Sequence, residues 1–219
     1  MIMQYLLRRW AMTVVAAHLF VLAGCSSSPR SPRAESSQGQ TIITLKPPPA
    51  NATDAEKIAA PHIIEDFSAP CIEAFPDDAA VEAFASEQTL APMSESELRR
   101  LLGRDPGEGW IGKGQSGTYI LTIEKPPYHS CAIRVPFTGS PDVVVGQYSF
   151  VVSLWAATQH DNMASQPPMS VEIEGHPTVA YVYELTDLGG KPAGQFMLFV
   201  TSMLNGTYEL RLVRQMQPG

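Results

Sequence analysis

The chain has 219 residues, of which 44% are hydrophobic and 17% charged, with 22 acidic against 15 basic side chains and a net charge of −7. A chain of this size and composition can bury a core, which excludes wholesale disorder. The acidic balance, with no basic run, excludes nucleic acid as the main partner, because phosphate binding requires clustered Lys and Arg. No run of about 20 apolar residues occurs beyond the N-terminus, which excludes a multi-span membrane protein.

Residues 1–24 have the pattern of a bacterial secretion signal. Two arginines supply a positive start, a short apolar stretch follows, and the segment leads into Leu22-Ala23-Gly24-Cys25. This ending resembles the lipobox of bacterial lipoproteins, where small residues admit the signal peptidase and the cysteine thiol carries a diacylglycerol. A transmembrane anchor is the less favoured alternative, because the apolar run is shorter than a membrane span. We therefore predict a signal peptide at 1–24 and lipidation of Cys25.

Lipidation of Cys25 implies a place in the cell envelope. Several acyl chains on one cysteine satisfy the requirement for stable anchoring. The next residue is Ser26, not the aspartate that commonly retains lipoproteins in the inner membrane, so the resemblance implies an outer-membrane protein facing the periplasm. The predicted partners are the membrane, through the acyl chains on Cys25, and an envelope protein.

Residues 25–60 are predicted to form a flexible tether. The segment is rich in serine and proline and has few large apolar residues, so it cannot bury enough surface to offset the entropy of ordering. An apolar island at 41–45 leaves open an additional edge strand. A single domain is predicted to follow at 61–216.

Three helices are expected at the start of this domain. Apolar residues recur at helical spacing over 63–75, with Pro70 bending or ending the helix. A second helix is expected over 77–85, where two aspartates suit the first turn. Ser94 and Glu97 have the spacing of a capping box and predict the start of a third.

The rest of the domain is predicted to be mostly strands. A helix over 143–159 interrupts the series, and Asn205-Gly206 is a strong hairpin signal. The expected fold is α+β, with N-terminal helices and one later helix packed on an antiparallel sheet of about five strands. Alternating apolar residues place these strands at 118–124, 129–137, 179–186, 195–202 and 207–214.

Two cysteines, Cys71 and Cys131, remain once Cys25 is lipidated. An oxidising compartment favours a disulfide between them, which would join the helical half of the domain to the sheet. A pair of buried free thiols, and a catalytic or metal-binding cysteine, are the alternatives. His129 shares the predicted strand face of Cys131, but the sequence singles out no oxyanion donor and no third catalytic group. We predict the disulfide and no catalytic residue.

No metal or cofactor is predicted. Residues 112–117 match the glycine pattern of dinucleotide-binding loops, but that motif requires a following helix, and here a strand is expected. A flexible turn is therefore favoured. The histidines of the mature chain do not have the spacing of metal ligands; they are His62, His129, His160 and His176.

Aromatic side chains are expected to gather on one face of the sheet. Tyr181 and Tyr183 alternate along one strand, and Phe196 and Tyr208 lie on neighbouring strands. Covering helices are the favoured explanation. A groove for a peptide or another extended partner is the alternative.

A second resemblance rests on residues near the two cysteines. They are Phe67 and Cys71, Phe75-Pro76-Asp77, Gly109-Trp110 before a strand, and Ser130-Cys131-Ala132-Ile133. In these positions the chain is similar to the NMCC_0638 family of small proteobacterial lipoproteins and periplasmic proteins. The resemblance implies secretion, and it carries over neither an activity nor a functional residue.

Function is therefore predicted as a class. A lipid anchor and a long tether favour a binding or accessory module that presents a surface in the periplasm. An envelope enzyme with an unrecognised site is one alternative. A carrier of a small ligand or a metal is the other.

Overall fold

The computed structural model describes residues 53–159 and 161–217. The predicted signal peptide, Cys25 and most of the predicted tether therefore lie outside the described residues. Among the described residues, no helix is long and apolar enough to cross a membrane. The helices are α1 (Asp54–Phe67), a π-helix (Ser68–Ala74), α2 (Asp78–Glu87), α3 (Glu95–Leu102), α4 (Pro141–Gln159) and a 3-10 turn (Leu204–Gly206).

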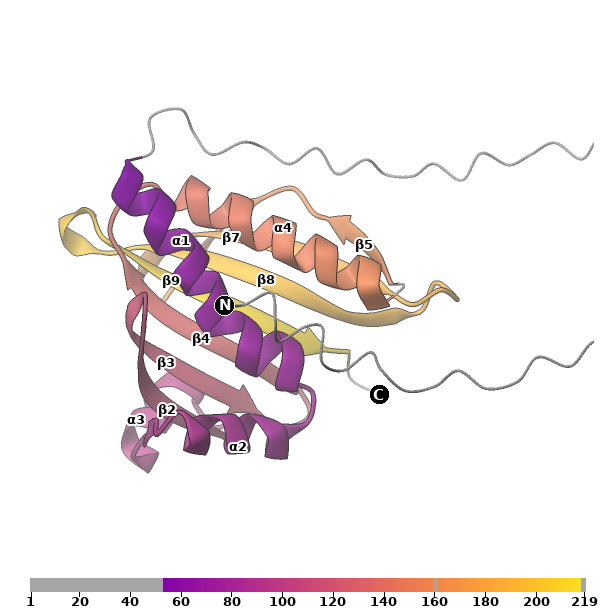
Figure 1. Cartoon of the computed structure of the whole chain (residues 1–219), viewed down its shortest axis with the longest axis horizontal. Helices are drawn as coiled ribbons and strands as arrows, with labels where there is room; N and C mark the ends of the chain where they lie inside the picture. The colour runs from indigo at the N-terminus through magenta and orange to yellow at the C-terminus, as the bar shows by residue number, and fades with distance from the viewer. Residues whose placement is uncertain (1–52, 160, 218–219) are drawn as a thin grey trace, which may run out of the picture. The chain divides into compact units, whose positions relative to one another are not determined.

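The described strands form one antiparallel sheet in the order β1-β2-β3-β4-β9-β8-β7-β5, with β6 also paired to β7 (Figure 1). The predicted α+β class is confirmed, but this sheet has nine strands where about five were expected. The strands are β1 (Ala91–Pro92), β2 (Gly107–Gly114), β3 (Gly117–Glu124), β4 (Ser130–Phe137), β5 (Asn162–Ser165), β6 (Met169–Ile173), β7 (His176–Thr186), β8 (Pro192–Ser202) and β9 (Tyr208–Met216).

The strand missed in the glycine-rich stretch is β2. Glycine normally weakens a strand, because it has no side chain to pack and loses much entropy. Here its small size is required: a Cβ on Gly112 would lie 2.5 Å from the ring of Tyr119, and a Cβ on Gly109 would lie 2.9 Å from Leu98. Residues 112–117 thus end β2 and begin β3, with the turn expected there confined to the residues between the two strands.

The first helix begins inside the segment predicted as tether. Thr53 and Glu56 form a capping box that starts α1 at Asp54, so the helical region extends N-terminal to the predicted boundary at residue 61. The helix expected over 63–75 is continuous, but it widens into the π-helix from Ser68, and Pro70 lies in this wider segment. The capping boxes of α1 and α3 are both formed.

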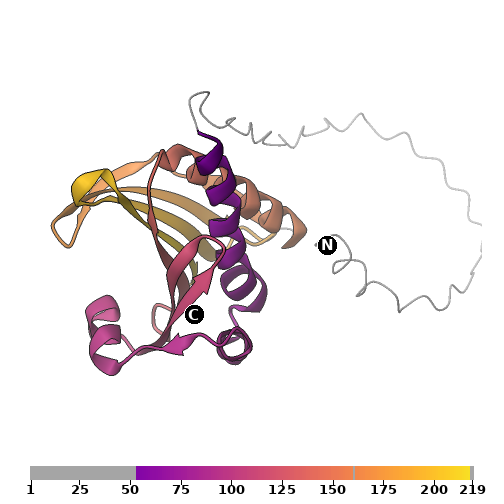
Figure 2. The same cartoon turned by 60° about the vertical axis from the view of Figure 1, so that its left-hand side comes forward.

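The helices α1 and α4 cover one face of the curved sheet, whereas α3 lies on the other side (Figure 2). Tyr148 on α4 is fully buried, and its hydroxyl donates to the carbonyl oxygens of Met197 and Val213, both at 2.9 Å. Its ring contacts Tyr183, and Phe196 contacts Trp155. The favoured explanation of the aromatic sheet face, a cover of helices, is therefore confirmed for these rings.

The last two strands form the predicted hairpin. Ser202 faces Tyr208, so the connection is longer than the two-residue turn that Asn205-Gly206 suggests, and it contains the 3-10 turn. Gly206 has φ +72, a conformation in which glycine carries no steric penalty. The hairpin brings β9 to the centre of the sheet, between β8 and β4.

Candidate functional site

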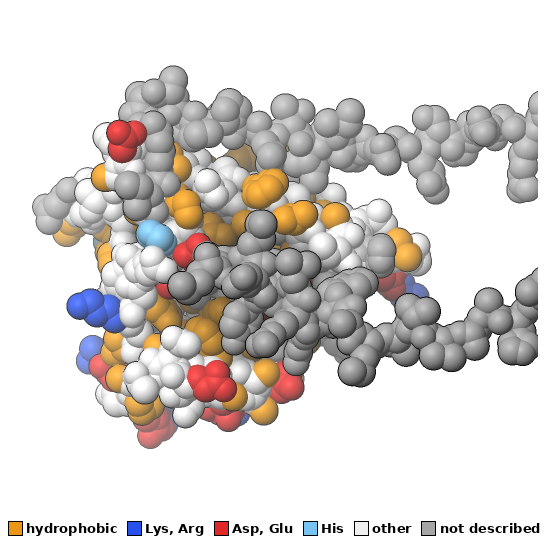
Figure 3. All heavy atoms as spheres, viewed as in Figure 1, with side chains coloured by type: hydrophobic (Ala, Val, Ile, Leu, Met, Phe, Trp, Pro, Cys, Tyr) orange, Lys and Arg blue, Asp and Glu red, His pale blue; other side chains and the backbone are white. Residues whose placement is uncertain are grey.

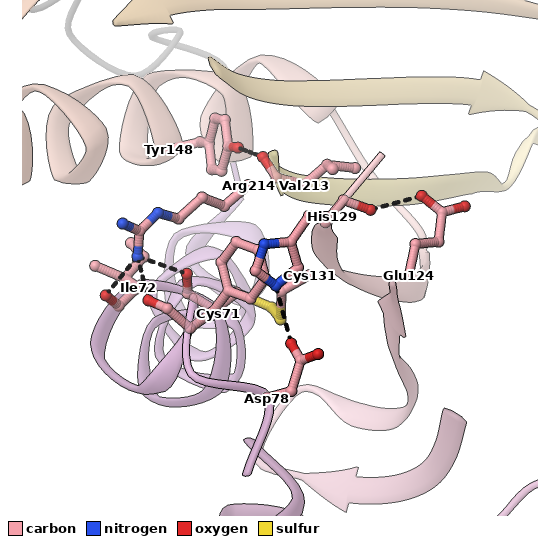
Figure 4. The surroundings of a disulfide bond; sticks show 11 residues. Cys71, Ile72, Asp78, Glu124, His129, Cys131, Tyr148, Val213 and Arg214 are labelled. Carbon is pink, nitrogen blue, oxygen red and sulfur yellow. Dashed lines mark hydrogen bonds and ion pairs between the residues drawn. A yellow bond between two sulfur atoms is a disulfide. The ribbon is translucent and has the colours of Figure 1, made fainter. Parts of the chain in front are cut away.

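The structure contains the predicted disulfide between Cys71 in the π-helix and Cys131 on β4, with a Cα–Cα distance of 5.3 Å (Figure 4). A disulfide-bonded sulfur is not a thiolate nucleophile, so the Cys–His alternative fails. His129 also lies outside β4, whose first residue is Ser130. Its Nε2 is instead 3.0 Å from the Asp78 carboxylate.

Arg214 lies beside the disulfide on the helix-covered face. Its Nη1 donates to the carbonyl oxygens of Cys71, Ile72 and Phe75, and its guanidinium carbon is 4.4 Å from the Trp155 ring centroid (Figure 4). Burial lowers the pKa of Arg214 to about 10, so the side chain stays protonated at neutral pH. Arg214 therefore connects the π-helix to β9, with each of these contacts made inside the fold.

The opposite face of the sheet, called here the open face, carries a different set of side chains. Side chains alternate along a strand, and those beside Leu121, Ile133 and Leu212 in sequence point away from the helix-covered core. The strand registers align one residue of this face from each of seven neighbouring strands, in the spatial order β2, β3, β4, β9, β8, β7 and β6. This cross-sheet row is Ile111, Ile120, Arg134, Arg211, Phe199, Ala180 and Met169.

Two arginines occupy the centre of the cross-sheet row. Arg134 and Arg211 face each other directly across β4 and β9, an arrangement of like charges that is unfavourable by itself. Arg134 is 8% exposed and donates to a Glu209 carboxylate oxygen at 3.4 Å. The ion pairs among the described residues do not include Arg211, and its buried Nε has no hydrogen-bond partner there. Its guanidinium instead lies 5.9 Å from the Phe199 ring centroid.

The surroundings of Arg211 disfavour the protonated, charged form of its side chain. Burial lowers the pKa of Arg211, and the facing Arg134 lowers it further. Carboxylates act in the opposite sense, but one of them already accepts a hydrogen bond from the Ser130 hydroxyl at 2.6 Å, and another pairs with Arg134. These carboxylates belong to Glu124, Glu209 and Glu174.

Two hollows lie on the open face beside the arginines. The larger, of about 550 Å³, includes Arg134 and has the size of a small-ligand site. The smaller, of about 280 Å³, includes Arg211. The apolar lining of the larger hollow includes Ile120, Pro136, Met203, Leu204 and Tyr208. The smaller hollow is lined also by Phe199, Met197, Val213, Ser130, Gln215, Tyr128, Glu124 and Asp105.

The helix-covered side of the domain exposes apolar side chains of α4. Phe150 and Leu154 on α4 are 43% and 55% exposed. Apolar side chains accordingly appear over α4 in Figure 3, with acidic side chains over α2. Phe150 and Leu154 line neither of the two hollows of the open face.

The other residues that the sequence singled out are placed as follows. Cys25 and His160 lie outside the described residues. His176 lines the larger hollow. His62 pairs with Glu65 on α1. Within 53–159 and 161–217, no three His, Cys, Asp or Glu side chains gather in a metal-binding group.

Neither the two arginines of the open face nor Arg214 was predicted from the sequence as a functional residue. An arginine in a strand normally predicts a solvent-facing position, and the pattern of β9 gives no sign that one of them is unpaired. The signal that was present is the spacing of Arg211 and Arg214, which places them on opposite faces of one strand.

No family model, no curated protein and no solved structure matches the chain. The resemblance to the NMCC_0638 family therefore stays a prediction.

Proposed function

We propose that the chain is a lipid-anchored protein of the bacterial envelope that acts as a binding module, with the open face as its binding surface. The observation that carries this proposal is Arg211, a partly buried charge with no ion pair among the described residues. A desolvated charge without a partner costs stability. A bound ligand that supplies the partner offsets this cost, which gives the open face a reason to hold Arg211.

The anchor and the tether support the same function. A chain held at the outer membrane by acyl chains on Cys25 needs no further membrane contact, so its domain is free to present the sheet. This part of the proposal is tested by the intact mass of the mature chain. The expected mass is that of a chain beginning at Cys25 with acyl groups added, and an unmodified Cys25 would contradict the anchor.

The binding surface is tested by photocrosslinking in cells. A photoreactive amino acid replaces Val171, which is 40% exposed next to the cross-sheet row, and in a matched control it replaces Leu154, which is 55% exposed on the helix-covered side. We expect a discrete adduct from position 171 and none from position 154, read out by mass spectrometry. Equal adducts from both positions, or an adduct from position 154 alone, would contradict the assignment of the open face.

A further inference from the structure

We propose that the ligand of the open face is an anionic amphiphile, with a single carboxylate or phosphate group on one apolar chain, and that Arg211 binds the anionic group. This inference rests on the proposed function and names its ligand class. Four features carry it: the unpaired guanidinium, the facing arginine, the flanking carboxylates and the apolar surface on both sides.

The anionic group follows from the two arginines. A guanidinium presents a planar set of donors that matches a carboxylate or a phosphate, often with two hydrogen bonds. Arg211 lines the smaller hollow, and its buried Nε has no hydrogen-bond partner among the described residues, whereas Arg134 uses Nη1 for Glu209. An anion placed over Arg211 also relieves the repulsion between the two facing cations.

The carboxylates around the pair limit the ligand to one anionic group. Glu124, Glu209 and Glu174 all act on Arg211, and Asp105 lines the smaller hollow. These charges repel a polyanion such as a nucleic acid, which needs several cations along its backbone. A single acidic group that contacts Arg211 directly gains the close pairing and meets the carboxylates only at longer range.

The apolar body follows from the rest of the cross-sheet row. The row continues from the arginines through Ile120 and Ile111 on one side, and through Phe199 and Met169 on the other. Ile111 and Met169 are 37% and 48% exposed, so apolar area remains to be buried by a ligand. The larger hollow beside Arg134 has mostly apolar walls and is large enough for part of an acyl chain.

Two amphiphiles of this chemistry share the palmitoyl chain and differ in their polar end. Palmitate ends in a carboxylate, whereas 1-palmitoyl-lysophosphatidylglycerol carries a phosphate diester on the glycerol to which its palmitoyl chain is esterified. The binding experiment uses the mature chain, residues 25–219, exported by a cleavable signal and carrying Cys25→Ser so that it is free of acyl groups. Each amphiphile is titrated below its critical micelle concentration, and the dissociation constant is measured by calorimetry and native mass spectrometry.

We expect saturable binding of at least one amphiphile, with one ligand per chain. Arg211→Gln should weaken this binding by about tenfold or more, as expected for the loss of a charge-assisted hydrogen bond. The matched control is Arg100→Gln, which removes the same charge from an exposed position on α3 and should leave the dissociation constant unchanged. Preference for one amphiphile identifies the anionic group as carboxylate or phosphate.

A thermal measurement separates this role from a structural one. In the absence of ligand, Arg211→Gln should leave the melting temperature unchanged or raise it, because it removes an unpaired charge that faces Arg134. With amphiphile added, the wild-type chain should gain melting temperature through binding to the folded state, and the variant should gain less. A variant that is less stable without ligand would show that Arg211 is needed for folding, and would overturn the proposal.

The remaining outcomes are also decisive. If neither amphiphile binds, or if binding is the same in Arg211→Gln, the proposed ligand class is wrong. An adduct at position 171 in cells would then leave the open face as a binding surface for a different partner. Loss of both the adduct and the binding would contradict the ligand class and the proposed function together.

Discussion

Removal of the Cys71–Cys131 disulfide should lower the free energy of unfolding by about 4 kcal/mol. The two cysteines are separated by 60 residues, and a crosslink across a loop of this length restricts the unfolded chain by roughly that amount. Both sulfurs are fully buried, so their contacts with the core add to the effect of the crosslink. The experiment compares urea unfolding of the oxidised wild type with Cys71→Ala/Cys131→Ala.

The control separates the crosslink from the packing of the side chains. The wild type unfolded in the presence of a reductant keeps both cysteines and loses only the bond. We expect most of the lost stability to appear in this reduced sample. A loss below about 1 kcal/mol in both samples would contradict the assignment of the disulfide as the main link between the π-helix and β4.

The substitution Arg214→Met should have the next largest effect and lower the free energy of unfolding by about 3 kcal/mol. The variant keeps an unbranched apolar chain of similar length, so packing near Trp155 is largely retained. It removes the donor to three carbonyl oxygens, those of Cys71, Ile72 and Phe75. Hydrogen bonds to a charged group contribute more than neutral ones, and buried acceptors left without a donor add a penalty.

The matched control is Arg100→Met on the exposed surface of α3. It makes the same chemical change where no buried acceptor is lost, and should alter the free energy of unfolding by less than about 0.5 kcal/mol. Similar small losses in both variants would mean that the contacts of Arg214 with the π-helix contribute little. A further check is that Arg211→Gln, on the opposite face of the same strand, does not share the loss.

Much of the fold could be predicted because local signals agreed with the tertiary structure. The capping box at Ser94 and Glu97 starts α3 where expected, and α4 was found from its apolar residues despite their β-branching. With Cys25 predicted to be lipidated, two cysteines remained, and the disulfide predicted between Cys71 and Cys131 is confirmed. In each case the prediction depended on residues close together in sequence, or on the number of cysteines in the chain.

The missed features depend on contacts between distant segments. The glycines of β2 read as turn residues, since their need for close packing against Tyr119 and α3 appears only in the folded sheet. Met169–Ile173 is a short edge strand, defined by its pairing with β7 more than by its own residues. The facing of Arg134 and Arg211 depends on the register of two strands that are far apart in sequence. A one-residue shift of that register would move each set of side chains to the other face.

The most direct test of the central claim observes the side chain of Arg211 itself. The Nε–H resonance of each arginine in the mature Cys25→Ser chain can be followed by NMR as palmitate or 1-palmitoyl-lysophosphatidylglycerol is added. We predict that the Arg211 resonance shifts and gains protection from exchange in step with binding, while that of Arg100 stays fixed. An unchanged Arg211 resonance at saturating ligand would contradict the claim that the open face binds an anion through this residue.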